Sequence, residues 1–197
     1  MEKIVLSEKE LLLLSEIYPT LKYNKDKNTI SGKLKFDLTY SSRNETRIKD
    51  EYSIEILLYS PDGSYLPIVR ETGDKIRKIA VRKKIDIKAL HLNSANGKMC
   101  IIIPPKEQER YPNGFKLQEY LHHLEEHFYW ISYFDRYEKK PWKDQNHSEN
   151  GYLELFKENR HKYRQDVKLY FEKKYNATLS GRQFNSFVKK LIKKGNI

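Results

Sequence analysis

The alternation of apolar and polar residues predicts an antiparallel sheet in the first half of the chain. Apolar side chains take every second position in residues 33–40, which is the pattern of a half-buried strand. Residues 52–58 alternate in the same way, and a third short run at 66–71 follows a Pro-Asp-Gly turn signal at 61–63. The polar residues 41–50 predict the hairpin loop between the first two strands. Together these runs predict an antiparallel meander.

A helix is predicted ahead of this meander. Ser7 and Glu10 match a capping box, in which each side chain satisfies a backbone N–H of the other residue. Leucines follow at 11–14. Pro19 ends the helix or follows it closely, because proline cannot continue the backbone hydrogen bonds.

Longer helices are predicted in the second half of the chain. Apolar residues spaced by four and three define a helix over 116–138, and Pro141 ends it. Residues 142–150 are then a polar loop, and residues 151–175 form one helix or two. The apolar stripe of the first helix comprises Leu117, Leu121, Leu124, Phe128 and Ile131.

A final helix is predicted near the carboxyl end. Ser180 and Gln183 match a second capping box, an apolar stripe follows, and Gly195 suits the C-cap. Residues 72–90, where basic residues alternate with isoleucines, are interpreted as a basic strand or loop. The order of helix, about four antiparallel strands, irregular segment and helices is that of an α+β fold, with the helices against one side of the sheet.

The composition adds a tyrosine-rich core and a basic charge to this picture. The 197 residues are 38% hydrophobic and include 15 tyrosines, so large aromatic side chains are expected to supply much of the buried area. The net charge of +11 favours an acidic partner such as nucleic acid, an anionic surface or an acidic protein. An ordinary lysine-rich surface is an equal alternative, because the basic residues are spread along the chain.

The single cysteine, Cys100, excludes an intramolecular disulfide and a multi-cysteine zinc site. No motif indicates a cofactor. The amino-terminal apolar run is too short for a signal peptide or a membrane span, so we expect a cytoplasmic location and no membrane partner.

Three histidines in the longest predicted helix are the remaining metal candidates. His123 and His127 lie one turn apart, but the intervening Glu126 is not placed as in a His-Glu-x-x-His zinc site. His122 points to a different face of the helix from His123. A solvated or partner-facing helix is therefore favoured over a metal site.

Cys100 lies between a turn-rich segment, residues 93–97, and an apolar run, residues 101–103, that two prolines close. A cysteine at the edge of irregular backbone can be reached by a large substrate. The alternative is a small core residue on a strand, because free cysteine is among the most buried residue types.

The residues before the cysteine carry a resemblance to a known family. His91-Leu92-Asn93, then Gly97 and Cys100, resemble the active-site signature of ubiquitin-conjugating enzymes: a His-Pro-Asn tripeptide, a turn with a glycine and the catalytic cysteine. The central proline is replaced by Leu92, and the gap to the cysteine is about one residue shorter than usual.

Elements on both sides extend this resemblance over roughly residues 5–155. Tyr59, Pro61 and residues 66–69 are similar to the Tyr-Pro and Pro-x-Val elements that precede the active site, and a long helix follows the cysteine. Bacterial members often lack the proline and carry a Trp and a His-x-x-x-Gly element further on. Trp142, His147 and Gly151 look similar.

The resemblance implies a conjugating domain over residues 1–155 and a helical extension, residues 156–197, packed on the same domain. It also implies that Cys100 holds a protein C-terminus as a thioester and transfers it to a lysine or another nucleophile. Asn93 would stabilise the oxyanion or hold the active-site loop, and His91 would structure that loop.

Partners are implied by the resemblance alone. The bacterial members occur in anti-phage operons, including those built around a cGAS-like nucleotidyltransferase. The carried protein would be that nucleotidyltransferase or a ubiquitin-like protein. Its activation would come either from a separate adenylating enzyme or from an unusual substrate.

Two other functions stay open from the sequence. The missing proline and the shortened gap fit a non-catalytic scaffold of the same fold. The charge and the tyrosines fit a basic nucleic-acid-binding module, which is not favoured because no RNA-binding motif is recognisable. The basic residues Lys189, Lys190, Lys193 and Lys194 belong either to a docked helix with a solvated face or to a contact with nucleic acid or an acidic partner.

Overall fold

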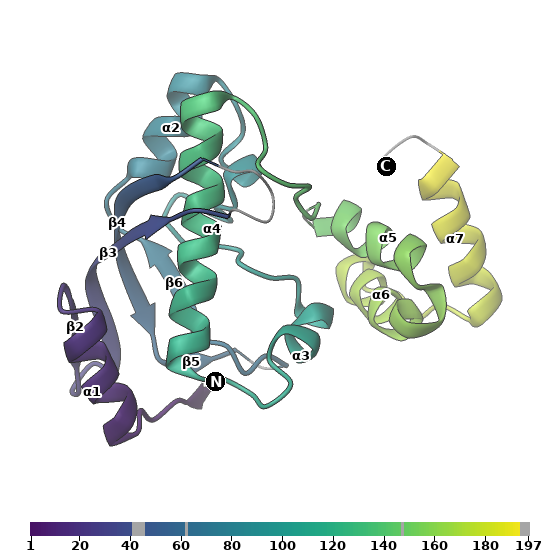
Figure 1. The fold of residues 1–197 in the computed structure, drawn as a ribbon. Coiled ribbons are helices and arrows are strands. Elements are labelled where there is room, and N and C mark those ends of the chain that lie inside the picture. Colours follow the sequence, from purple (N-terminus) through teal and green to yellow (C-terminus); the bar gives the residue numbers. More distant parts are fainter. Residues whose placement is uncertain (41–45, 62, 147, 194–197) are drawn as a thin grey trace. The chain divides into compact units, whose positions relative to one another are not determined.

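The computed structural model of the protein describes residues 1–40, 46–61, 63–146 and 148–193 (Figure 1). Several residues of the sequence predictions lie outside this part of the chain: Asp62 of the turn signal, His147, Lys194, Gly195 and residues 41–45 of the hairpin loop.

The chain divides into two compact units, Met1–Lys143 and Asp144–Ile197, called here the first and the second unit. The sequence-based division after residue 155 runs through α5 (Ser148–Glu158), which belongs to the second unit.

A four-stranded antiparallel sheet forms the centre of the first unit. Its strands β2 (Leu21–Asn24), β3 (Thr29–Leu38), β4 (Ile48–Leu57) and β6 (Ile68–Glu71) pair in chain order. The predicted strands correspond to β3, β4 and β6, whereas β2 and the first four residues of β3 were not predicted. The fold is α+β with an antiparallel meander, as expected. Two short strands, β1 (Glu2–Lys3) and β5 (Tyr59–Ser60), pair separately.

The pairing of β3 with β4 runs unbroken from Thr29 opposite Leu57 to Leu38 opposite Ile48. Residues 48–50, which the sequence pattern assigns to the hairpin loop, are therefore strand. The pattern missed them because Asp50 interrupts the apolar alternation. Its side chain lies on the inner face of β4, where Ser132 Oγ donates to it at 2.8 Å and Lys75 forms an ion pair with it.

Helix α1 (Glu8–Ile17) begins with the predicted capping box and ends before Pro19. The Ser7 N–H donates to the Glu10 carboxylate at 2.8 Å. The same carboxylate accepts the Leu117 N–H at 3.0 Å, so it also caps the start of the longest helix.

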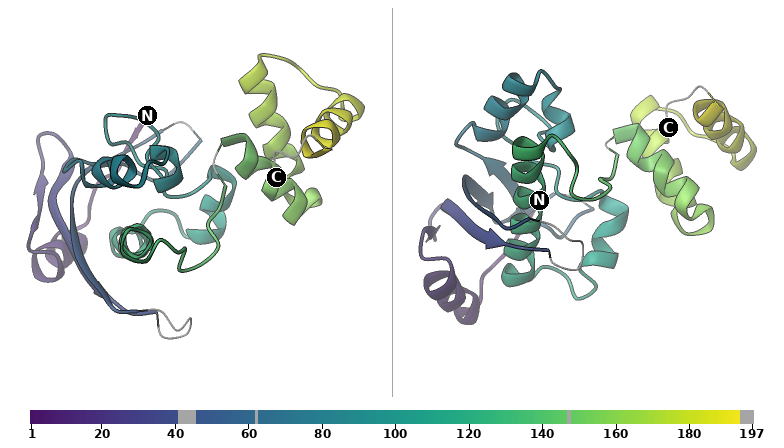
Figure 2. Two further views of the ribbon diagram at one scale, coloured as in Figure 1. Left: turned by 90° about the horizontal axis from the view of Figure 1, so that it is seen from above. Right: turned by 45° about the horizontal axis from the view of Figure 1, so that its top comes forward.

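That helix, α4 (Leu117–Tyr137), matches the prediction and lies across one face of the sheet (Figures 1 and 2). Its apolar stripe is fully buried. The Phe128 ring stacks on Tyr52 of β4 with centroids 4.2 Å apart, and Tyr52 stacks on Phe36 of β3. The core is therefore rich in aromatic side chains, as the composition indicated.

The prediction of a basic strand or loop at 72–90 is wrong. The segment contains α2 (Lys75–Lys83) and a 3-10 helix at Ile87–Leu90. Ile76, Ile79 and Ala80 are buried at helical spacing, and the basic residues take the remaining positions. The sequence pattern was misleading because this helix is only nine residues long. Its few buried apolar positions are interspersed with lysines and arginines, so the helical period of 3.6 residues is hard to distinguish from alternation.

Two short helices, a 3-10 turn at Pro104–Lys106 and α3 (Glu107–Arg110), lead into α4. The second unit contains α5, α6 (Arg160–Tyr175) and α7 (Gly181–Lys193). The predicted segment 151–175 is thus two helices, and α5 begins inside the predicted loop 142–150. Asn159 separates the two helices and caps α6, accepting the Lys162 N–H at 3.0 Å.

No helix in the described part of the chain has both the length and the apolar character needed to cross a bilayer.

The packing of α4 predicts the effect of truncating its central ring. Phe128→Ala should lower the free energy of unfolding of the first unit by about 3–5 kcal/mol, because it removes a fully buried ring and leaves a cavity. Urea titration followed by tryptophan fluorescence measures this, since both tryptophans lie in the first unit. The control Tyr137→Ala, on the exposed end of α4, should change the value by less than about 1 kcal/mol. Equal effects would contradict the packing.

Candidate functional site

Cys100 lies at the end of a short hairpin. Leu92 and Met99 form a bridge across it, and the Asn93 N–H donates to the Lys98 carbonyl at 2.8 Å. The Cys100 N–H donates to the His91 carbonyl at 2.8 Å. The backbone at the cysteine is therefore tied directly to the His91-Leu92-Asn93 segment that the sequence singled out.

The returning arm of this hairpin pairs with β6. The Glu71 N–H donates to the Gly97 carbonyl at 2.9 Å, and the Met99 N–H donates to the Val69 carbonyl at 3.0 Å. Lys98 lies opposite Arg70 in an antiparallel bridge. Residues 97–99 thus extend the sheet by one short arm, and Cys100 is the first residue beyond it.

Gly97 is required by this close pairing. Its φ is +80°, and a Cβ at this position would lie 2.1 Å from the Glu71 carbonyl oxygen. A side chain here would collide with the backbone of β6, which cannot move out of the sheet. The glycine that carried part of the family resemblance therefore has a local physical reason.

Burial alternates along both arms of the hairpin. Leu92 and Met99 are buried in the core, whereas Asn93 and Lys98 are exposed, and Cys100 is half-buried. Asn93 lies opposite the exposed Lys98, whereas Cys100 lies opposite the buried His91. Asn93 and Cys100 are thus diagonal neighbours across the hairpin, and such neighbours lie about 7–8 Å apart.

His91 anchors the hairpin to α4. It ends the 3-10 helix at Ile87–Leu90 in a left-handed conformation, with φ of +63°, and its side chain is buried. Its ring meets the edge of His127 at 4.3 Å between centroids and that of Trp130 at 5.5 Å. Trp142 also contacts this region, since its carbonyl accepts from the Trp130 indole at 3.2 Å. Gly151, the other described residue of that sequence element, lies in α5 of the second unit.

Glu71 is a buried carboxylate beneath the hairpin that sequence reasoning missed. Its backbone bonds Gly97, and its side chain accepts the Gly73 N–H at 2.8 Å and backbone N–H groups of Lys75 and Ile76. It therefore caps α2 while supporting the cysteine segment. Burial raises its pKa above the usual value. The only sequence signal was an acidic residue two positions before a glycine, which is too common to single out.

The three histidines of α4 have different surroundings. His122 is exposed and lies near Glu125 and Glu126, His123 is hydrogen-bonded to the Tyr111 hydroxyl at 2.7 Å, and His127 faces His91. The described residues contain no group of three His, Cys, Asp or Glu side chains arranged to hold a metal ion.

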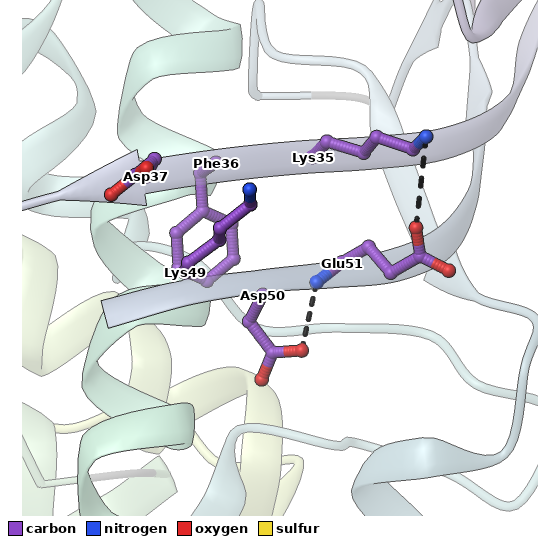
Figure 3. Close-up of a pocket in the computed structure, with 6 residues that line it drawn as sticks. All are labelled: Lys35, Phe36, Asp37, Lys49, Asp50 and Glu51. Atoms are coloured by element: carbon purple, nitrogen blue, oxygen red, sulfur yellow. Dashed lines mark hydrogen bonds and ion pairs between the residues drawn. The ribbon is translucent and has the colours of Figure 1, made fainter.

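An open cavity of about 410 Å³ lies over β3 and β4 (Figure 3). Its walls include Lys35, which faces Glu51 at 3.9 Å across the strands. The full lining comprises Lys35, Phe36, Asp37, Lys49, Asp50 and Glu51. None of the three predicted catalytic residues belongs to it. The cysteine hairpin is therefore separate from this cavity.

Neither the protein-family models, nor the curated proteins, nor the solved structures that were compared with this chain give a match. The structure nevertheless brings His91, Asn93 and Cys100 together on one hairpin, with Gly97 at its turn. A function has to be inferred from these residues and their geometry.

The close approach at Gly97 predicts a position-specific loss of stability. Gly97→Ala should cost at least about 2 kcal/mol more than Gly114→Ala, because overpacking against a backbone is added to the strain of positive φ. Gly114 is the matched control, since its φ is +75° and nothing lies within 4 Å of the place that a Cβ would take. Chemical denaturation measures both variants. A cost no larger than that of the control would exclude the steric contact.

The Tyr111–His123 pair predicts a pH effect. Burial lowers the pKa of His123 to about 4, whereas the unfolded chain titrates near pH 6.5. Between these values the unfolded state binds a proton that the folded state does not. The stability contribution is therefore present above pH 6.5 and lost on acidification, by roughly 3 kcal/mol in total.

Urea titrations at several pH values test this prediction. The stability advantage of the natural chain over His123→Gln should shrink as the pH falls from 7 to about 4. Parallel curves for the natural chain and His123→Gln would refute the prediction.

Proposed function

We propose that the protein is a ubiquitin-conjugating-like acyl carrier that holds a protein C-terminus as a thioester on Cys100. The observation that carries the proposal is the hairpin: its backbone bonds hold Cys100 and the exposed Asn93 on one short segment, while the His91 ring packs against His127 and Trp130 of α4. Cys100 is only partly buried, which suits a thiol that has to meet a macromolecular substrate.

The order of elements supports the same proposal. A helix, a four-stranded meander in chain order, the cysteine hairpin and a long helix across the sheet follow one another in the first unit. This is the order that the resemblance to ubiquitin-conjugating enzymes implies.

The absence of the family's proline has a local explanation. Leu92 takes its position, and the Leu92 N–H donates to the Ile87 carbonyl at 3.1 Å. Proline has no N–H and could not make this bond. The Leu92 side chain is also buried in the core. Leucine in place of the family's proline therefore fixes the same segment by a different hydrogen bond and by burial of its side chain. The missing proline is then a weaker argument for a non-catalytic scaffold.

The first chemical step is acyl transfer to the cysteine. The Cys100 thiolate attacks the carbonyl carbon of a C-terminus activated as an acyl adenylate by a separate enzyme. A carbon–sulfur bond forms, the tetrahedral intermediate collapses, and AMP leaves with the bonding electron pair. The thiol proton passes to solvent.

The second step releases the acyl group. The neutral lysine amine attacks the thioester carbonyl, a carbon–nitrogen bond forms, the carbon–sulfur bond breaks, and the Cys100 thiolate leaves with the bonding electron pair. The amine loses one proton to solvent. The Asn93 carboxamide is proposed to donate to the oxyanion of the tetrahedral intermediate. His91 acts as a positioning residue through its carbonyl bond to Cys100. From the resemblance alone, the carried protein would be a cGAS-like nucleotidyltransferase or a ubiquitin-like protein in a bacterial anti-phage system.

The experiment follows the thioester directly. The full chain is incubated with ATP, an adenylating enzyme and either candidate protein, and the products are separated without reducing agent. The natural chain should form an adduct that thiols cleave. Cys100→Ser should form an adduct that resists thiols, because an oxyester replaces the thioester, and Cys100→Ala should form none. A thiol-sensitive adduct on Cys100→Ala would contradict the proposal that Cys100 carries the acyl group.

The oxyanion role predicts a difference between two asparagines of one loop. Asn93→Asp should slow transfer to lysine by about 10²–10³, because the N–H donor is lost. Asn96→Asp is the matched control: it adds the same charge and keeps the oxygen that accepts the Lys98 N–H at 3.2 Å. Single-turnover discharge of the adduct onto free lysine measures both rates. If both variants slowed the transfer equally, the effect would be due to the added charge, and the proposed role of the Asn93 amide would be excluded.

A further inference from the structure

Helix α7 buries its apolar side within the second unit. Phe184 and Val188 are almost completely inaccessible. The Phe184 ring contacts Phe156 of α5 at 5.6 Å between centroids, and the Phe187 ring contacts Phe171 of α6 at 5.3 Å. The apolar side is therefore already covered, and it is not available to a membrane or to an apolar groove of another protein.

The opposite side of α7 is basic and exposed. No acidic residue occurs between Gly181 and Lys193. The exposed residues recur at intervals of three or four and so form one stripe along the helix. This stripe, called here the basic face, comprises Arg182, Ser186, Lys189, Lys190 and Lys193.

Helix α6 adds two guanidinium groups beside the first half of α7. Arg160 and Arg164 both donate to Asn185 Oδ1, at 3.1 and 2.5 Å, and Arg164 also donates to the Gly181 carbonyl at 3.2 Å. These partners are neutral, so the positive charges of the arginines are not cancelled by them. The positive potential of the basic face is thereby extended onto the neighbouring helix.

A short connection fixes the start of α7. Helix α6 ends at Asn176 in a left-handed conformation, and residues 177–180 lead to α7. The predicted capping box is present, since the Ser180 N–H donates to Gln183 Oε1 at 2.8 Å and the Gln183 N–H donates to Ser180 Oγ at 3.3 Å. Helix α7 thus follows α6 after a short connection, and its own capping box fixes where it begins.

We propose that the basic face of α7 docks in the major groove of duplex DNA. The major groove of B-form DNA admits an α-helix, whereas that of an A-form RNA duplex is too narrow. The lysines would neutralise phosphates, and Arg182 and Ser186, in the first half of the helix, would face the base edges. The proposal concerns the second unit alone and does not depend on the chemistry of Cys100.

The test measures the binding of the full chain to a short mixed-sequence DNA duplex at several salt concentrations. A variant with Arg182, Lys189, Lys190 and Lys193 replaced by glutamine should bind about 100-fold more weakly at about 0.1 M salt. The slope of log affinity against log salt should fall by about 3. The matched control replaces four exposed lysines of the first unit by glutamine, Lys22, Lys25, Lys27 and Lys78, and should retain most of the affinity.

Two further probes separate DNA from other partners. An RNA duplex of the same sequence should bind more weakly than the DNA, and polyglutamate should not compete at equal charge. Equal loss of affinity in both quadruple variants would overturn the proposal, as would equal binding of RNA, or preferential binding of polyglutamate. Circular dichroism of the variants checks that α7 remains folded, which is expected because all four of its substituted side chains are exposed.

Discussion

The packing of α4 against β3 and β4 is the contact on which the first unit depends. Phe128 stacks on Tyr52 at the centre, and the Tyr52 hydroxyl meets Ser132 at 2.8 Å, so apolar contacts and a hydrogen bond hold the same surface. On the same helix, His127 and Trp130 contact the His91 ring. The helix that closes the core is therefore also the support of the cysteine hairpin.

The hairpin at residues 91–100 fixes the position of the Cys100 backbone. Its returning arm pairs with β6, and only glycine fits at residue 97, because the Glu71 carbonyl occupies the space of a side chain. The other arm uses the N–H of Leu92 at the position where ubiquitin-conjugating enzymes have proline. The backbone at Cys100 is thus held through the His91 carbonyl on one side and through the pairing of Met99 with Val69 of β6 on the other.

Where it is described, the second unit contains helices only, and aromatic side chains hold them together. Its three helices meet through large aromatic rings, and the charge that remains outside is entirely positive on α7. The side chains of Ser180 and Gln183, at its start, are engaged in capping. The proposed DNA contact and the proposed thioester chemistry use separate residues, in separate units of the chain.

Local patterns were enough to predict the capping box at Ser7, the stripe of α4 and the meander, because each depends on residues close in sequence. The same reasoning marked His91, Asn93 and Cys100 as one segment. It misread α2, whose short apolar side only becomes evident against the sheet. Tertiary structure alone decided that Glu71 lies against the hairpin and that only glycine fits at residue 97, since both follow from the pairing of the returning arm with β6, a strand distant in sequence.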